Sequence, residues 1–271
     1  PDGIDDLCRR AAAHRTAAVC VWPEFVARCA EALRGSGVRV ATVVNFPSGS
    51  ESVADVVDAT RQALADGADD IDVVLPYDAF TAGDTDRAAD MIAAVADVVD
   101  EPAILKVILE SGELADRDAV AAAARLAIEN GADFVKTSTG KTSHGASLDA
   151  AAAMLGEIAR THGESGRTVG FKPSGGIRSL DDAAAYIELA DDVMGAGWAT
   201  PATFRFGASG LLDALLAVID GDPDATPSTA RAASTPSTTR ARSGGAPPRL
   251  AGPLRQPYLC QKIARRGLQS V

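Results

Sequence analysis

The sequence contains very little lysine: five residues in 271, against 21 arginines. Aromatic residues are also scarce at 4%, so the core must be built from alanine, valine, isoleucine and leucine. No apolar run approaches the ~20 residues of a membrane-spanning helix, and no signal peptide is apparent, so no membrane is expected as a partner. Because lysine usually covers solvated surfaces, so small a number makes the position of each one informative.

Cysteine is equally rare. The four cysteines lack the spacing of a metal site or of a disulfide framework: Cys8, Cys20, Cys29 and Cys260. We therefore expect no metal, no cofactor and a reducing, cytoplasmic location.

The net charge of −11 is divided unequally between two regions. Residues 222–271 carry eight basic and two acidic residues, or +6, which leaves −17 for residues 1–221. Such an acidic body argues against nucleic acid and anionic membranes as partners. An anionic substrate must then be drawn by a local pocket of positive charge.

Apolar runs typical of strands alternate with helical patterns along residues 1–221. Strands are expected at Ala17–Val21, Val38–Val44, Ile71–Leu75, Ala103–Leu109, Phe134–Lys136, Val169–Lys172 and Val193–Ala196. Regular alternation indicates parallel strands, and about eight units in ~220 residues favour a TIM (β/α)8 barrel. A doubly wound open sheet is the alternative, but no Gly-x-Gly-x-x-Gly follows an early strand to support it.

The strand count is short by one. A barrel of this class begins with a strand, whereas this chain begins in a helical pattern, Ile4–His14. We expect the first strand to lie upstream of residue 1. Residues 222–271 form a Pro/Ser/Thr/Arg-rich tail without apolar periodicity, which we expect to be disordered. The predicted organisation is a barrel over residues 1–221 followed by this tail.

Four of the five lysines lie in or just after predicted strands, and two of them end neighbouring strands: Lys136 and Lys172. A lysine in a barrel mouth is costly to desolvate, so it gives up its proton readily and can attack a carbonyl. Two ammonium groups on strands ~4.8 Å apart cannot both stay protonated cheaply. We assign Lys136 as the nucleophile and Lys172 as its perturber, although the sequence allows the reverse. Alternatively, both lysines only bind phosphate.

Asp72 lies inside the apolar segment Ile71–Leu75, where an unpaired carboxylate is costly. In a barrel it would meet the lysines and shuttle protons through water during Schiff-base chemistry. The alternative is an ion pair that only orients a lysine. Lys106 and Glu110 lie on one strand, and they either pair with each other or border the site.

Glycine-rich turns follow the last predicted strands. The backbone N–H groups of Gly175 and Gly176, together with Arg178, are suited to a phosphate dianion. A second turn, Phe206–Ser209, contributes the Ser209 hydroxyl.

The turn after Lys136 adds Thr139 and Lys141 as candidate binding residues. Cys20 is either a small buried residue or a neighbour of the substrate. Together these features indicate Schiff-base chemistry on a phosphorylated carbonyl compound.

Seven segments in order resemble the family of deoxyribose-phosphate aldolases: Val-Cys-Val-Trp-Pro-Glu-Phe, Val-Val-Asn-Phe-Pro-Ser-Gly, Asp-Asp-Ile-Asp-Val-Val-Leu-Pro-Tyr, Leu-Lys-Val-Ile-Leu-Glu, Phe-Val-Lys-Thr-Ser-Thr-Gly-Lys, Gly-Phe-Lys-Pro-Ser-Gly-Gly-Ile-Arg and Arg-Phe-Gly-Ala-Ser. The resemblance covers roughly Asp5 to Gly221. It implies a metal-free class I aldolase on a TIM barrel, with Lys136 as Schiff-base lysine, Lys172 as its perturber and Asp72 as proton relay. The implied phosphate-binding positions are Lys141, Gly175, Gly176, Arg178 and Ser209.

The implied reaction is the reversible cleavage of 2-deoxy-D-ribose 5-phosphate to D-glyceraldehyde 3-phosphate and acetaldehyde. The sequence departs from the family in three ways. The family's first strand, with an Asp and a Thr that face the site, has no counterpart. Gly210 stands where some members have a second serine. The long tail ends in Val271 rather than in the family's terminal tyrosine, so Tyr258 is not given that role.

The main hypothesis is therefore an aldolase whose partner is a small phosphorylated sugar, with a homodimer as a possible assembly. The alternatives are another Schiff-base aldolase for a longer sugar phosphate and a non-catalytic phosphosugar-binding barrel.

Overall fold

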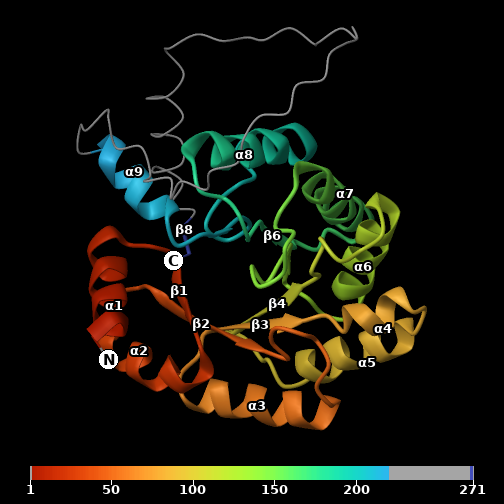
Figure 1. Ribbon diagram of the computed structural model, residues 1–271, viewed down its shortest axis with the longest axis horizontal. Coiled ribbons are helices and arrows are strands. Elements are labelled where there is room, and N and C mark those ends of the chain that lie inside the picture. The colour runs from red at the N-terminus through yellow and green to blue at the C-terminus, as the bar shows by residue number, and fades with distance from the viewer. Residues whose placement is uncertain (1, 220–268, 271) are drawn as a thin grey trace, which may run out of the picture.

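The protein is described by a computed structural model that covers residues 2–219 and 269–270. In this part of the chain a ring of parallel strands is surrounded by helices (Figure 1). The strands are β1 (Ala18–Val21), β2 (Arg39–Val44), β3 (Asp70–Val74), β4 (Ile104–Ile108), β5 (Phe134–Lys136), β6 (Gly170–Lys172), β7 (Phe206–Gly207) and β8 (Gln269–Ser270).

The strand order is β6-β5-β4-β3-β2-β1-β8-β7, and every neighbouring pair runs parallel. Parallel bridges pair Phe171 with Phe204 and Ser174 with Gly207, so the two ends of the sheet meet. The predicted TIM barrel is therefore confirmed.

Helices follow the strands and form the outer layer of the barrel. They are α1 (Asp2–His14), α2 (Val26–Ala32), α3 (Val53–Ala65), α4 (Tyr77–Thr81), α5 (Thr85–Ala96), α6 (Arg117–Glu129), α7 (Leu148–Ser165), α8 (Leu180–Met194) and α9 (Leu211–Ile219), with a 3-10 turn at Pro23–Phe25. None of the helices in the described residues is long and apolar enough to cross a membrane.

Strand β3 shows how the sequence determines the strand layer and the helix layer of the barrel. Its residues are all buried, because one face packs on helices and the other faces the barrel interior. Ile71 and Val73 join Val56 of α3 and Met91 of α5 in the hydrophobic core. Asp72 alternates with them and therefore faces the interior.

Five helices begin at a residue whose side chain accepts a hydrogen bond from the backbone N–H three positions later. These residues are Ser52, Asp84, Asp116, Ser147 and Ser179. Such caps satisfy a donor that the helix itself leaves free, so they fix where each turn ends and each helix starts.

The predicted strand at Val193–Ala196 is wrong. Helix α8 continues to Met194, and Gly195 follows it. Ile187 and Ala190 are buried while Val193 is 38% exposed, so the apolar residues continue a helical rather than a strand pattern. The strand of this unit is β7, which begins at Phe206, inside the segment that the sequence assigned to a turn.

Strand β8, at the end of the described chain, lies beside the first strand, β1. No described strand precedes α1, and the place between β1 and β7 is taken by β8, where Ser270 is in register with Ala18 and Gly207. Gln269–Ser270 belong to the tail that the sequence predicts to be disordered, and the structure describes these two residues as β8. The rest of that prediction, from residue 222 to 268 and at 271, lies outside the described residues.

Candidate active site

The carboxyl ends of the strands bring the predicted lysines together. Lys136 ends β5, Lys172 ends β6, and the two residues are register partners. Lys106 of β4 is likewise in register with Asp72 of β3. Side chains in register on adjacent parallel strands point to the same face of the sheet, which here is the barrel interior.

Asp72 is the common partner of three lysines. Its Oδ1 accepts a hydrogen bond from Lys106 Nζ at 2.9 Å. Its Oδ2 accepts from Lys136 Nζ at 2.8 Å and from Lys172 Nζ at 2.9 Å. All four residues are buried, and Lys136, at 5%, is the most exposed of them. The shared oxygen holds two amines within reach of one proton acceptor.

Burial and neighbouring charges distinguish the two lysines. Burial lowers the pKa of Lys136 below its usual value, the Asp72 carboxylate opposes that shift, and the Lys172 ammonium reinforces it. Burial also acts to lower the pKa of Lys172, but Asp72, Cys20 and Asp70 together outweigh it and the pKa is raised. Lys136 therefore loses its proton more readily than Lys172.

The three lysines also determine the charge of Asp72. Burial acts to raise its pKa, but the three ammonium groups outweigh burial and hold the pKa well below the usual range. The group is thus a carboxylate at neutral pH.

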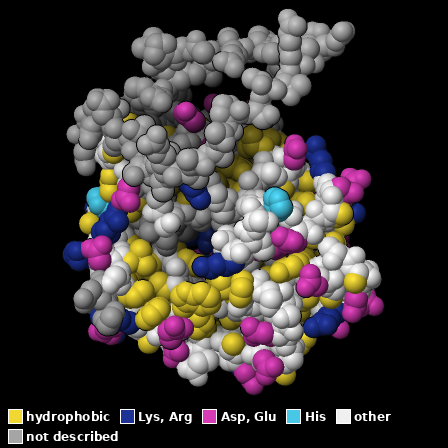
Figure 2. All heavy atoms as spheres, viewed as in Figure 1, with side chains coloured by type: hydrophobic (Ala, Val, Ile, Leu, Met, Phe, Trp, Pro, Cys, Tyr) yellow, Lys and Arg dark blue, Asp and Glu magenta, His cyan; other side chains and the backbone are white. Residues whose placement is uncertain are grey.

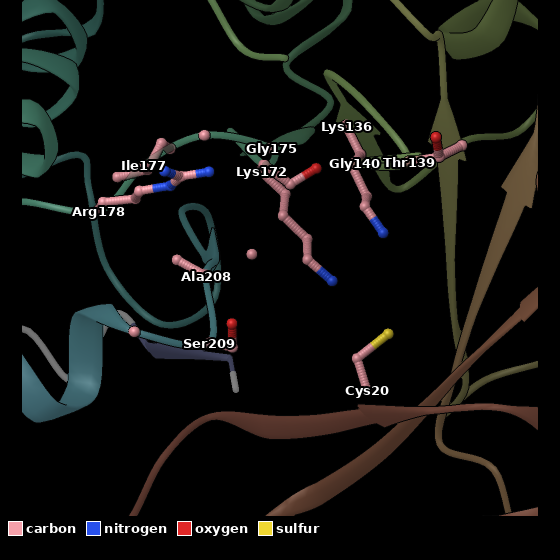
Figure 3. Close-up of a pocket in the computed structure, with 14 residues that line it drawn as sticks. Cys20, Lys136, Thr139, Gly140, Lys172, Gly175, Ile177, Arg178, Ala208 and Ser209 are labelled. Carbon is pink, nitrogen blue, oxygen red and sulfur yellow. The ribbon is translucent and has the colours of Figure 1, made fainter. Parts of the chain in front are cut away.

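A cavity of about 350 Å³ opens beside Lys136 and Lys172. Figure 3 shows both lysine side chains reaching into it, with Cys20 of β1 on the opposite side. In Figure 2, basic side chains gather in the hollow at the centre of this face. The remaining lining residues come from the turns after β5, β6 and β7: Thr139, Gly140, Ser174, Gly175, Gly176, Ile177, Arg178, Gly207, Ala208, Ser209 and Gly210.

The structure thus brings most of the predicted phosphate-binding residues to one cavity. The turn after β6 needs glycine, because Gly175 and Gly176 have φ angles of +90° and +86°. A Cβ on Gly175 would also lie 3.2 Å from Gly145 Cα. The turns lead into the N-termini of α8 and α9, which carry partial positive charge. The cavity is therefore suited to an anion.

Hydrogen bonds hold the turns after β5 and β6 against each other. Thr137 Oγ1 donates to the Ser174 carbonyl at 2.8 Å and accepts from Ser174 N at 2.9 Å. Glu110 accepts from Thr139 N at 3.1 Å, from the Thr139 hydroxyl and from the Thr142 hydroxyl at 3.2 Å. The Thr139 hydroxyl is thus engaged in ordering its own turn.

The suggested Lys106–Glu110 ion pair is wrong. Lys106 Nζ donates to Asp70 at 2.7 Å and to Asp72, both on the neighbouring strand β3. Glu110 lies beyond the end of β4 and bonds the turn after β5 instead. Asp72 is in register with Lys106, and Asp70 lies two residues earlier on the same face of β3, so both are closer to Lys106 than Glu110 is.

Lys141 does not line the main cavity. Its Nζ lies 5.9 Å from the centre of the Trp22 ring. Together they border an adjoining hollow of about 150 Å³, which Cys20 and Lys136 share with the main cavity. This placement differs from the expectation that Lys141 forms part of the phosphate cup.

Sequence reasoning missed two features of the site. The wall of the adjoining hollow includes Trp22 and Phe46, whose rings stack edge to face at 5.3 Å. The second carboxylate, Asp70, bonds Lys106 from below Asp72. The spacing Asp70-Ile71-Asp72 is a usable signal, because residues two apart on a strand share a face.

In the described part of the chain, no group of three or more His, Cys, Asp or Glu residues is placed to hold a metal ion. The polar groups that converge on the cavity are the lysines, Arg178, hydroxyls and backbone amides.

A closed parallel barrel with charged groups at the carboxyl ends of its strands is the architecture of TIM-barrel enzymes. The family model described as "DeoC/LacD family aldolase" matches residues 3–216, and the chain belongs to this family.

A curated relative is the deoxyribose-phosphate aldolase of Agrobacterium fabrum, which is 50% identical over 224 residues, or 82% of this chain and 85% of the relative. Solved structures of proteins assigned as deoxyribose-phosphate aldolases are also similar. The one from Coccidioides immitis is 31% identical with a TM-score of 0.68, covering 78% of this chain and 76% of its own. The one from Toxoplasma gondii is 26% identical with a TM-score of 0.71, covering 81% and 86%.

Proposed function

We propose that this aldolase reversibly cleaves 2-deoxy-D-ribose 5-phosphate to D-glyceraldehyde 3-phosphate and acetaldehyde through a lysine Schiff base. The observation that carries the proposal is the Asp72 oxygen shared by Lys136 and Lys172, beside a cavity suited to an anion. The 50% identity to the Agrobacterium fabrum enzyme supports the choice of substrate.

Lys136 is the proposed nucleophile. Its pKa is lowered, first by burial, whereas the pKa of Lys172 is raised, and a neutral amine is the form that attacks a carbonyl. Both Lys136 and Lys172 line the cavity, but Lys136 is the more exposed, at 5% against 1%. These differences favour Lys136 over the reverse assignment that the sequence left open.

The reaction follows from this assignment. The Lys136 amine adds to the aldehyde carbon, and loss of water from the carbinolamine leaves an iminium. The iminium accepts the electron pair of the C2–C3 bond while the C3 hydroxyl loses its proton, which releases glyceraldehyde 3-phosphate. Protonation of the resulting enamine and hydrolysis then release acetaldehyde. Asp72 and Lys172 are proposed to relay these protons through water.

The phosphate is proposed to bind at the turns containing Gly175, Gly176 and Ser209, near Arg178. Lys141 is proposed to join them by leaving Trp22. An exposed cation–π contact contributes only about 0.5–1 kcal/mol, whereas a hydrogen bond to a charged group contributes about 1.5–3 kcal/mol. Cys20, which lines both hollows, is proposed to lie beside the bound aldehyde.

Borohydride reduction in the presence of acetaldehyde tests the nucleophile. We expect the Lys136 peptide to gain the mass of one ethyl group formed from acetaldehyde, and Lys136→Arg to abolish the labelling. A non-catalytic binding protein would give no label, and labelling at Lys172 would reverse the two roles.

The phosphate site is tested by Lys141→Met and Arg178→Ala. Each should raise KM for the phosphorylated sugar far more than for unphosphorylated 2-deoxyribose, by about tenfold or more for a lost charge-assisted contact. Equal effects on the two sugars would place the phosphate elsewhere.

A cytoplasmic location is also proposed, supported by the free thiols of Cys8, Cys20 and Cys29. The fourth cysteine, Cys260, lies outside the described residues. The homodimer stays a prediction.

A further inference from the structure

A chain of alternating charges, buried except for the partly exposed Arg39, runs beneath Lys136 and Lys172. Arg39 Nε donates to Asp70 Oδ1 at 2.6 Å, and Lys106 Nζ donates to Asp70 Oδ2 at 2.7 Å. Lys106 Nζ also donates to Asp72 Oδ1 at 2.9 Å. Asp70, Asp72 and Lys106 are each 0% exposed. We call these four residues, Arg39, Asp70, Lys106 and Asp72, the charge chain.

Arg39 and Asp70, at the end of the charge chain away from Asp72, make further contacts. Arg39 also donates to the backbone carbonyls of Asp69 at 2.7 Å and Pro102 at 3.0 Å. A second cation, Arg205 Nη1, lies 3.9 Å from Asp70 Oδ2. Asp70 is therefore held by three cations at the amino ends of the strands, where no substrate reaches, and its one link to the site is Lys106.

The charge chain determines which oxygen of Asp72 serves the reactive lysines. Lys106 occupies Oδ1, so Lys136 and Lys172 are left to share Oδ2. Without Lys106, each oxygen would take one lysine and the two amines would separate. Without Asp70, the Lys106 charge would stand uncompensated beside the site.

We propose that Asp70 and Lys106 are positioning residues for the proposed Schiff-base reaction: Lys106 makes Lys136 and Lys172 share one oxygen of Asp72, and Asp70 compensates the buried charge of Lys106. The inference rests on the proposed function but concerns groups that never touch the substrate. The charged and titratable groups that face the pair from the surrounding strands are Cys20, Arg39, Asp70, Asp72, Lys106 and Arg205.

Two variants with opposite expected signs test the proposal. Asp70→Asn removes a negative charge two residues below Asp72, about 7 Å along the strand. The Lys136 and Lys172 ammonium groups then lose stabilisation, so the pH midpoint of acetaldehyde trapping by borohydride should fall by roughly one unit. Lys106→Met removes a positive charge next to Asp72, so the same midpoint should rise by a similar amount.

Matched controls separate charge from packing. Asp69→Asn removes the neighbouring carboxylate, which accepts from the Val40 backbone N–H instead, and should leave the midpoint unchanged. Asp70→Glu keeps the charge and should restore the wild-type midpoint. Thermal denaturation of each variant shows whether it folds, and if Asp70→Asn does not fold, the sign of the shift in Lys106→Met decides.

The outcomes are distinguishable. If no lysine of the wild-type enzyme is labelled, the proposed function fails, and a label on Lys172 instead overturns the present proposal, which requires it on Lys136. If Lys136 is labelled and the two variants shift the midpoint in opposite directions, the proposal holds. A lower rate with an unchanged midpoint, or shifts of the same sign, would mean that Asp70 and Lys106 serve only the fold and would overturn it.

Discussion

Replacing Lys172 with methionine should raise the pH at which Lys136 becomes reactive. The two Nζ atoms share Asp72 Oδ2 at 2.8 and 2.9 Å, which places them roughly 5 Å apart when the angle at the oxygen is near tetrahedral. At an effective dielectric constant of about 20, two unit charges at that distance repel by about 3 kcal/mol, or about two pKa units. Removing the Lys172 charge therefore stabilises the Lys136 ammonium by that amount.

The direction of the pH shift follows because the protonated amine of Lys136 is the unreactive form. In wild type the pKa of Lys136 is lowered, first by burial and also by Lys172. In Lys172→Met its pKa rises, so at a pH below both values the neutral fraction falls by about 100-fold. Raising the pH should recover imine formation. Asp72 keeps Lys106 and Lys136 as partners, so the fold should persist.

The assay is the rate of borohydride-trapped acetaldehyde on the Lys136 peptide between pH 5 and pH 10. Lys172→Arg, which keeps the positive charge, is the matched control and should hold the midpoint near that of wild type. A Lys172→Met enzyme that is slower by one constant factor at every pH would refute the electrostatic reasoning. Complete loss of the label would instead point to Lys172 as the nucleophile.

Two further predictions concern the packing of Gly207 in the site and the contribution of β8 to the barrel. A Cβ at Gly207 would lie 2.5 Å from Ser174 Cβ and 3.3 Å from Lys172 Cε, so Gly207→Ala should cost about 1–3 kcal/mol of stability and lower kcat. In the packing control Gly210→Ala the new Cβ meets nothing within 4 Å, so its melting temperature should stay unchanged. Equal melting temperatures for the two variants would contradict the predicted clash. Ending the chain at residue 268 removes β8 from between β1 and β7, so the melting temperature should fall with the loss of about 1–3 kcal/mol of backbone pairing. Deleting Val271 alone should leave the melting temperature close to that of the wild type. An unchanged melting temperature after the longer deletion would show that β8 does not support the barrel.

The parts of the fold that sequence reasoning predicted correctly are those whose signal is local. Each of the first six predicted strands is an apolar run of period two or a continuous buried segment, and each matches a strand from β1 to β6. The strand at Val193–Ala196 was misplaced because valine and methionine at the end of α8 suit either structure, and only packing against the barrel decides. The short β7 has two residues, too few for any periodicity.

Sequence reasoning indicated the candidate site residues that are charged residues inside apolar strands. It missed the contacts whose partners come from distant segments of the chain. Asp72 and the lysines are charged residues inside apolar strands, which is a cost visible in the sequence. The partner of Lys106 was not visible, because cross-strand register decides it: Asp72 and Lys106 pair across β3 and β4. The position of Lys141 on Trp22 depends on how two turns, 119 residues apart in the sequence, pack over the barrel mouth.

Lysine is scarce in this acidic chain, and the few lysines are concentrated at the site. Of the five lysines, three are buried around Asp72. A buried lysine without a carboxylate would be strongly destabilising, and without Lys172 the pKa of Lys136 would be lowered by burial alone. Three cations on one carboxylate, with Asp70 compensating one of them, leave an excess of positive charge inside an acidic protein. We expect this excess to help lower the pKa of Lys136 and to attract an anionic substrate to the cavity beside it.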